Sequence, residues 1–338
     1  MEKEMQHMSI YQVLQGHRHK DRAMHRELID IEFVNAAGQH LRSGADKARG
    51  GAATMALQQL GVSGKLVAGR LNAIMGPSGC GKTTLIKVLS GRMLPAKHVD
   101  VVDATRGGLE AGSEAMPRSG LSSLRFRENL DYAACLRMRP GTPGSWRSAV
   151  VYAIMKDLEL YTRENQVVGS EQRPAISGGE RKRVNIGMGV VALPPILFLD
   201  EPTSGLDTRM SEEVVRLTWG LARVANMNVI CVIHQPSTRA FDMFDFLMLL
   251  SHDQRVAYLG PPEACRDYFY FTLKFQKDFQ GSDGSNVADA ILRITSDTGS
   301  NKLSESGIRG EDITLAWLAG GRERLYQTAN RSTQEKLE

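Results

Sequence analysis

The chain reads GPSGCGKT at residues 76–83, and this stretch decides its fold. The stretch fits the pattern G-x-x-x-x-G-K-[ST] and lies between a strand-like segment, LVAGRLNAIMG, and a segment with helical spacing, KTTLIKVLSGR. Its glycines let the backbone wrap closely around an anion, which the amide groups and the positive end of the following helix stabilise. The sequence therefore predicts a strand–loop–helix unit that holds phosphate groups.

The side chains of this loop have separate expected tasks. Lys82 supplies a point charge for the β- and γ-phosphates, and Thr83 offers a hydroxyl to Mg²⁺. Cys80 is expected to be only a small filler. The cofactors predicted from this loop are therefore ATP and Mg²⁺. The residues expected to bind them are Gly76, Pro77, Ser78, Gly79, Cys80, Gly81, Lys82, Thr83 and Thr84.

A second stretch, LDEPTSGLD at residues 199–207, follows the almost wholly apolar run ILFLD, which is typical of a strand buried on both faces. Asp200 and Glu201 stand at the carboxyl end of that strand, where open sheets bind ligands. There one carboxylate can reach Mg²⁺ while the next addresses a water molecule. His234 ends the next apolar run, NVICVIHQ, and is expected at the same edge.

The order of strand-like and helical segments predicts an α/β fold with a parallel sheet. A segment with helical spacing at 211–225 lies between the two apolar runs, and strands that alternate with helices pair in parallel. A helical block extends from about residue 124 to about 160. Two stretches are poor in large apolar side chains: the Ala/Gly-rich one at 36–53, which is expected to be an insertion or loop, and the one at 96–123, which lacks a strand pattern.

Composition excludes several classes of protein. The formal net charge is only +4, and the basic residues are dispersed, so no nucleic-acid partner is expected. The four cysteines are far apart and form no CxxC pair, which favours reduced thiols in the cytosol. The longest apolar run, residues 186–199, is shorter than the roughly 20 residues that span a bilayer. No transmembrane helix is predicted.

ISGGERKR at 176–183 adds a further motif, and the motifs in this order resemble the ATP-binding cassette (ABC) ATPases. The resemblance covers about residues 60–295 and is nearest to the G, or White-type, transporter subfamily. It rests on MGPSGCGKTTL, RENLDYAACLRM, ISGGERKRVNIG, LDEPTSGLD, HQPS and N-x-A-D at 286–289.

The resemblance implies a P-loop ATPase core with a RecA-like sheet, a small antiparallel β part and an α-helical subdomain that carries the signature ISGGERKR. The expected boundaries are a polar tail at 1–27, the ATPase domain at 28–295 and a linker-like tail at 296–338. The helical subdomain is expected at about 121–189.

The resemblance also implies roles for single residues. Two copies would pair head to tail, so that Ser177, Gly178 and Gly179 of one copy close on ATP held by Lys82 of the other. Asp200 would assist Mg²⁺, and Glu201 would be the general base. Asp207 would lie at the dimer seam, and His234 would be the switch histidine.

Two departures from the family pattern stand out. No glutamine occurs between Gln59 and Gln166, although the family has one at the start of the helical subdomain that senses Mg²⁺ and the transmembrane partner. No aromatic residue occurs between Phe33 and Phe126, so Phe33 is the remaining candidate to stack on adenine, with a core position in a strand as its alternative.

These observations favour an ATP-hydrolysing subunit that powers transmembrane export through ATP-dependent dimerisation. Its expected partners are a second ABC ATPase domain and a transmembrane domain on another chain or on a missing part of this one. It would then lie at the cytosolic face of a membrane, or in the cytoplasm if it stands alone. The alternatives are a soluble ABC ATPase without a transport role, and a truncated product that binds nucleotide but lacks hydrolysis because of the missing glutamine.

Overall fold

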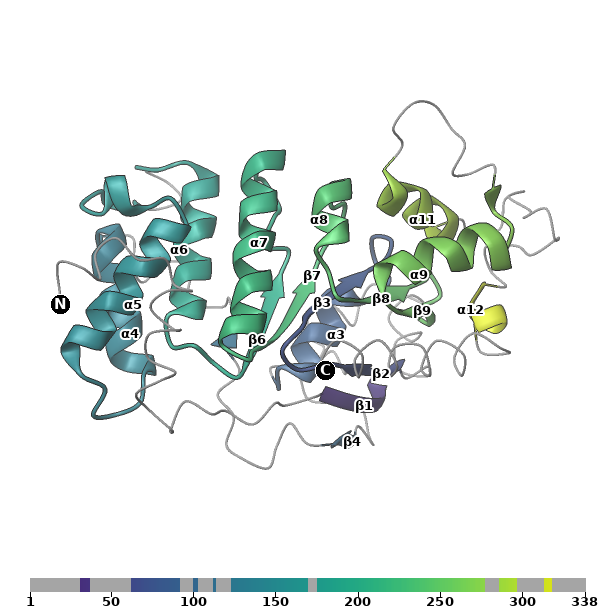
Figure 1. Ribbon diagram of the computed structural model, residues 1–338, viewed down its shortest axis with the longest axis horizontal. Helices are drawn as coiled ribbons and strands as arrows, with labels where there is room; N and C mark the ends of the chain where they lie inside the picture. The colour runs from purple at the N-terminus through teal and green to yellow at the C-terminus, as the bar shows by residue number, and fades with distance from the viewer. Residues whose placement is uncertain are drawn as a thin grey trace, which may run out of the picture. The chain divides into compact units, whose positions relative to one another are not determined.

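The chain folds into two compact units. Figure 1 shows its helices and strands, coloured along the chain by residue number. Unit 1 comprises Met1–Ile29, Ala68–Leu71 and Gly107–Cys231, and unit 2 comprises the remainder. Two of the boundaries between the units fall within strands, one in β3 (Leu71–Met75) and one in β7 (Asn228–Val232). This computed structural model describes residues 31–36, 62–91, 100–102, 112–113, 123–169, 175–276, 286–296 and 313–317.

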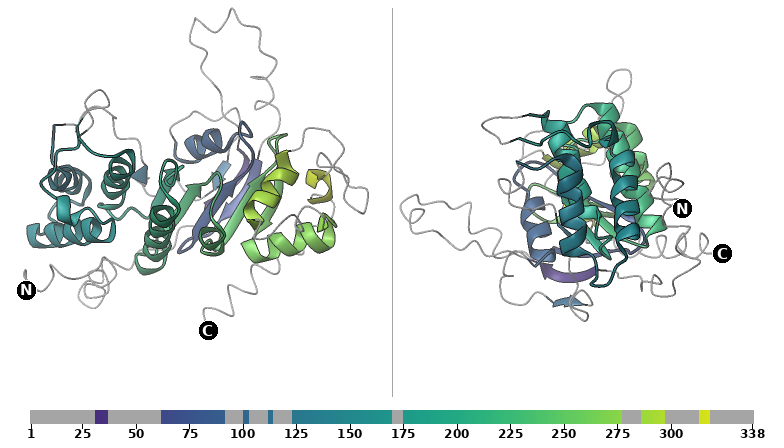
Figure 2. Two further views of the ribbon diagram at one scale, coloured as in Figure 1. Left: turned by 90° about the horizontal axis from the view of Figure 1, so that it is seen from above. Right: turned by 90° about the vertical axis from the view of Figure 1, so that its left-hand side faces the viewer.

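Unit 1 contains a group of packed helices, as Figures 1 and 2 show. A Cβ atom on Gly187 would lie 3.1–3.4 Å from side-chain atoms of Leu158, Leu130 and Ile154, so glycine at this position permits close packing. The helical block predicted at about 124–160 is confirmed. The elements of this group are α4 (Phe126–Arg137), α5 (Gly144–Asp157), the 3₁₀ turn η5 (Tyr161–Arg163) and α6 (Gly178–Val190).

Unit 1 also holds strands β5 (Gly112–Ser113), β6 (Ile196–Asp200) and most of β7 (Asn228–Val232), in that order in the sheet. The predicted strand ILFLD is β6, and its first four residues are buried. Helix α7 (Thr208–Val224) buries one apolar stripe and begins three residues earlier than the helical spacing predicts. It begins there because the Asp207 carboxylate accepts a hydrogen bond of 2.8 Å from the Met210 N–H.

Unit 2 contains β3 (Leu71–Met75) from Asn72 onward, and α3 (Lys82–Leu89). Strand β3 pairs in parallel with β8 (Phe246–Leu250), which pairs antiparallel with β9 (Val256–Gly260). A separate antiparallel sheet has the order β2-β1-β4. Its strands are β1 (Ile31–Ala36), β2 (Val62–Leu66) and β4 (Asp100–Val102).

The structure corrects two expectations about strands. The segment LVAGRLNAIMG is not one strand, because a turn with Gly69 at φ 66° separates β2 from β3, and the two strands belong to different sheets. The stretch 96–123 does contain strands. Within it β4 pairs with β1, and β5 pairs in parallel with β6.

The last part of unit 2 is mostly helical. Directly before α11 (Val287–Ser296), Asn286 donates from Nδ2 to the Pro236 carbonyl and accepts from the Ala288 N–H. The Trp317 ring lies 5.2 Å from that of Tyr258 and 5.5 Å from that of Tyr268. The elements are α8 (Thr238–Asp242), α9 (Pro262–Asp267), the π-helix η6 (Tyr268–Thr272), α11 (Val287–Ser296) and α12 (Ile313–Ala316).

Some expectations lie outside the described residues. These are the polar tail at 1–27, most of the Ala/Gly-rich stretch at 36–53, most of the linker-like tail at 296–338, and the side chain of Phe33. In the part of the chain that the structure describes, no helix combines the length and the apolar character needed to cross a membrane.

Candidate functional site

The loop between β3 and α3 needs glycine where the sequence has it. Gly76 has φ 152°, and a Cβ atom there would lie 2.5 Å from the Leu250 carbonyl oxygen and 2.7 Å from Cys80 Sγ. Gly79 and Gly81 have φ values of 80° and 94°, which other residues rarely adopt. The predicted strand–loop–helix context is confirmed.

We expect Gly76→Ala to lower the free energy of unfolding by at least about 2 kcal/mol, since it adds a clash with backbone to a strained φ. Gly79→Ala is the matched control. A Cβ atom on Gly79 would meet nothing within 4 Å. Gly79→Ala should therefore cost only about 1 kcal/mol, which is the cost of placing a residue with a Cβ atom in left-handed backbone. Denaturant unfolding of both variants measures the difference, and equal losses would contradict the role assigned to the Leu250 contact.

The ammonium group of Lys82 lies against the backbone of the phosphate loop. Its side chain is buried, and Nζ donates hydrogen bonds of 2.8 Å to the carbonyls of both Gly76 and Pro77. A buried ammonium ion needs such acceptors, so these two carbonyls hold it beside the glycine backbone. Burial raises the pKa of the Cys80 thiol despite the charge of Lys82. Cys80 is therefore a neutral filler, as expected.

A pocket of about 490 Å³ opens beside this loop within unit 2. It brings His234 to the first residues of the phosphate loop, although the two are far apart in the sequence. It also contains residues of α11 that no sequence motif indicates, apart from Asp289 in N-x-A-D. Among the residues that the structure describes, the Oδ1 atom of Asp289 is buried and has no hydrogen-bond partner. The lining residues are Gly76, Pro77, Ser78, His234, Gln235, Asp289, Leu292, Arg293 and Ser296.

The two acidic residues lie in unit 1, at the end of β6. Asp200 is the last strand residue, and the chain turns at Glu201, whose φ is 52°. Left-handed backbone is uncommon for a residue with a side chain and is often found at functional sites. The turn is closed by a hydrogen bond of 3.1 Å from the Ser204 N–H to the Glu201 carbonyl. Asp207 then caps α7.

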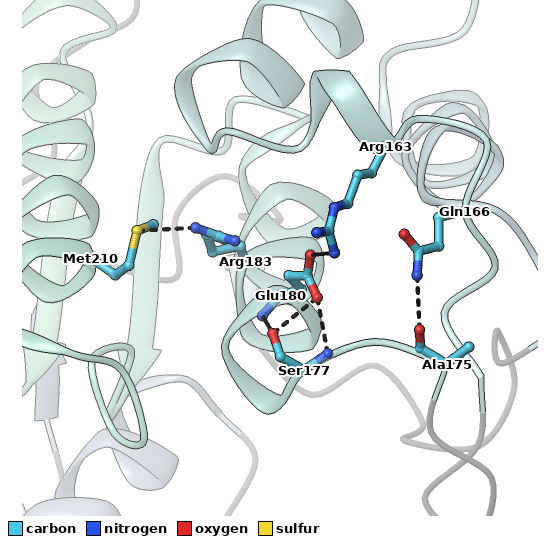
Figure 3. A network of polar contacts seen from close by, with 7 residues as sticks. All are labelled: Arg163, Gln166, Ala175, Ser177, Glu180, Arg183 and Met210. Carbon is cyan, nitrogen blue, oxygen red and sulfur yellow. Dashed lines mark hydrogen bonds and ion pairs between the residues drawn. The ribbon is translucent and has the colours of Figure 1, made fainter.

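The signature residues also lie in unit 1 and begin α6. Ser177 is the N-cap, and its Oγ accepts a hydrogen bond of 3.2 Å from the Glu180 N–H. The polar contacts of this region are drawn in Figure 3. A Cβ atom on Gly179 would lie 2.9 Å from Leu206 Cδ2, so the signature contacts the turn that precedes Asp207.

The predicted residues therefore form two groups. Unit 2 contains the phosphate loop, Thr84 and His234, and unit 1 contains the signature, Asp200, Glu201 and Asp207.

Comparison with known proteins agrees with this set of motifs. Residues 60–204 match the family model described as ABC transporter. The chain is 38% identical over 215 residues to "ABC transporter G family member 25" of Oryza sativa subsp. japonica, a match that covers 62% of this chain and 21% of the rice protein. It carries an ABC ATPase domain of the G subfamily. The predicted family is confirmed.

A second relative of this ABC domain is a yeast protein, the "Uncharacterized ABC transporter ATP-binding protein/permease YOL075C" of Saccharomyces cerevisiae. It is 34% identical over 268 residues, which cover 74% of this chain and 20% of the yeast protein. The chain thus spans about a fifth of the length of each of these two curated relatives.

Solved structures show the same fold as this ABC domain. The ATP-binding cassette MJ0796, in a dimeric post-hydrolysis state with ADP and Pi, has a TM-score of 0.53 at 20% identity, with 69% of this chain and 98% of that one covered. A bacterial Atm1-family ABC exporter with ATP bound has a TM-score of 0.54 at 23% identity, with 81% and 43% covered. The predicted P-loop α/β fold class is confirmed.

Proposed function

We propose that this chain binds ATP with Mg²⁺, hydrolyses the ATP between two paired ATPase domains, and thereby powers transport through a transmembrane domain. The observation that carries the proposal is the pocket in unit 2, because it joins the glycine cradle of the phosphate loop to His234. The glycine backbone and the Lys82 ammonium group provide the donors that phosphate oxygens need.

The residues present suit both cofactors. The backbone of the loop suits an anion, because the left-handed φ values of Gly79 and Gly81, 80° and 94°, curve it tightly enough for successive N–H groups to face one. Thr83 and Asp200 offer hydroxyl and carboxylate oxygens, the ligands that Mg²⁺ prefers. When bound, Mg²⁺ would neutralise charge on the phosphates. Residues Pro77 to Thr84 would surround the phosphates from the loop and the first turn of α3.

The chemistry of hydrolysis falls to Glu201 and His234. Glu201 would accept the proton of the attacking water, and the left-handed turn would fix the direction of its carboxylate. His234 would hydrogen-bond the terminal phosphate or that water from the pocket.

The signature would serve a second copy of the domain. Ser177 is exposed and begins a 13-residue helix, with Gly178 and Gly179 as its first residues. A helix N-terminus of this kind binds anions. Asp207, exposed at the start of α7, would lie at the seam. The dimeric structure of the similar fold in MJ0796 supports this pairing.

Similarity to G-family transporters supports the role in transport. A transmembrane domain would place the chain at the cytosolic face of a membrane, and the similar fold in an Atm1-family exporter favours export. Within the chain we propose an ATPase domain at 28–295 with a helical subdomain at about 121–189, between a polar tail at 1–27 and a linker-like tail at 296–338. Nucleic acid is not among the proposed partners.

We expect the full chain carrying Glu201→Gln to be a monomer without nucleotide and a dimer with Mg-ATP. Each phosphate hydrogen bond from an opposing signature contributes about 1.5–3 kcal/mol, or about tenfold or more in affinity. Ser177→Arg should abolish the dimer, because its bulk fills the phosphate position. Sedimentation velocity measures both.

The matched control is Ser148→Arg, at an exposed position on α5. It should leave the ATP-dependent dimer intact. A chain that stays monomeric although calorimetry shows bound ATP would contradict the proposed pairing.

A further inference from the structure

The carboxylate of Glu180 uses each of its oxygens for a different task. Oε2 accepts hydrogen bonds of 2.9 Å from both the backbone N–H and the hydroxyl of Ser177, and Oε1 accepts one of 2.6 Å from Arg163 Nη1. Figure 3 shows the carboxylate between these two partners. Glu180 is buried, whereas Ser177 is exposed.

This arrangement places a negative charge beside a proposed phosphate contact. The Ser177 hydroxyl is one hydrogen bond away from the Glu180 carboxylate, and a nucleotide phosphate reaching Ser177 would meet that charge at close range. Like charges at such distances repel strongly where water is partly excluded. A cation on the far side of the carboxylate is therefore needed to offset the repulsion.

Arg163, in the turn η5, supplies the positive charge that balances the Glu180 carboxylate. Its side chain is 55% exposed while that of Glu180 is 11% exposed, so the arginine partly covers the carboxylate. A second contact comes from Gln166, whose Nε2 donates a hydrogen bond of 2.8 Å to the carbonyl of Ala175, directly before the signature. The segment that carries Arg163 is thus joined to the start of α6 by two side-chain hydrogen bonds.

The carboxylate is ionised at neutral pH. Burial by itself would raise the pKa of Glu180, but the Ser177 hydrogen bonds and the charges of Arg163 and Arg183 outweigh it, and the net direction is down. Arg183 Nη1 donates to Met210 Sδ, at 3.2 Å, so the Arg183 charge lowers the pKa of Glu180 without a direct contact. The ion pair that the structure describes for Glu180 is the one with Arg163.

We propose that Arg163 is a positioning residue of the signature. By neutralising Glu180 it lets the Ser177 hydroxyl turn to the terminal phosphate of ATP held by a second copy of the chain. The inference rests on the proposed ATP-dependent pairing and adds a charge-balancing residue to it. Arg163 itself would touch no nucleotide.

The test measures ATP-dependent dimerisation of the full chain in the Glu201→Gln background. Arg163→Gln should weaken the dimer about fivefold, the upper range for an exposed ion pair, without changing ATP affinity of the monomer. The difference should shrink at about 1 M salt, where charges are screened within about 3 Å. Arg163→Lys, which keeps the charge, should lose less than Arg163→Gln.

Rescue separates charge balance from a structural role. Adding Glu180→Gln to Arg163→Gln should restore the dimer, because the amide still holds Ser177 and carries no charge. The matched control is Arg216→Gln on α7, where an arginine of 57% side-chain exposure pairs with Glu213 at 3.0 Å, and it should leave the dimer unchanged.

Three outcomes would overturn the inference. Unchanged dimerisation of Arg163→Gln would show that the charge is not needed, and a weakened dimer without rescue would show that Arg163 acts only on folding. A Glu201→Gln parent that binds ATP without pairing would refute the proposed function and this inference with it.

Discussion

Replacing Glu201 by Gln should lower the rate of ATP hydrolysis by roughly a hundredfold or more while ATP still binds. The physical reason is that Gln keeps the size and hydrogen-bonding capacity of the side chain but cannot accept a proton. Loss of a general base typically costs a factor of about 10² to 10⁴. Steady-state phosphate release from the full chain with Mg-ATP gives the rate.

The backbone supplies a matched control for this variant. Glu159 follows α5 with φ 55°, close to the 52° of Glu201, and its exposed side chain pairs with Arg209. Glu159→Gln therefore tests the same substitution on the same backbone geometry without a proposed part in the chemistry. Equal turnover in Glu201→Gln and the parent would refute the general base. A parent without turnover would favour a chain that binds nucleotide and lacks hydrolysis.

Lys82→Ala should lower ATP affinity by about tenfold to a hundredfold, because the N–H of Nζ that is left over can make one charge-assisted hydrogen bond to phosphate, of about 1.5–3 kcal/mol, and that bond is lost. The alanine also leaves the carbonyls of Gly76 and Pro77 without the donor they now have. Phosphate charge would then meet carbonyl oxygens with no cation between them. Calorimetric titration with ATP measures the loss.

Lys87→Ala is the control for this second variant, since Lys87 is exposed in the last turn of the same helix. It changes the net charge equally but should leave affinity within about twofold, because an exposed lysine distant from the ligand is largely screened. Equal affinity for Lys82→Ala and the parent would contradict the role of Lys82.

Elements whose residue types and spacing over a few positions allow only one structure could be predicted from the sequence. The glycine-rich loop, the buried strand ILFLD and helix α7 follow from residue type and spacing over a few positions. The sequence also contains a signal for the start of α7 at Thr208, because Asp207 is a residue type that caps helices. The apolar spacing alone predicts a later start. The roles of the site residues stay predictions.

Features that depend on distant partners could not be predicted. Strands β4 and β5 are three and two residues long, and each is defined by a neighbour elsewhere in the chain. The position of α11 beside the phosphate loop depends on the Asn286 hydrogen bond to Pro236, which no local pattern reveals. The division of LVAGRLNAIMG did have a local signal, because its fourth residue is Gly69, which favours a turn.

The contact between Gly76 and Leu250 has a consequence for synthesis of the chain on the ribosome. The phosphate loop emerges early, but β3 pairs with β8, and Leu250 at the end of β8 is the backbone that closes against Gly76. The long segment Gly107–Cys231 of unit 1 is complete before β8 has been made. The nascent chain therefore completes its helical part first and its phosphate cradle only after Leu250 has emerged, which gives the loop a late, long-range step in folding.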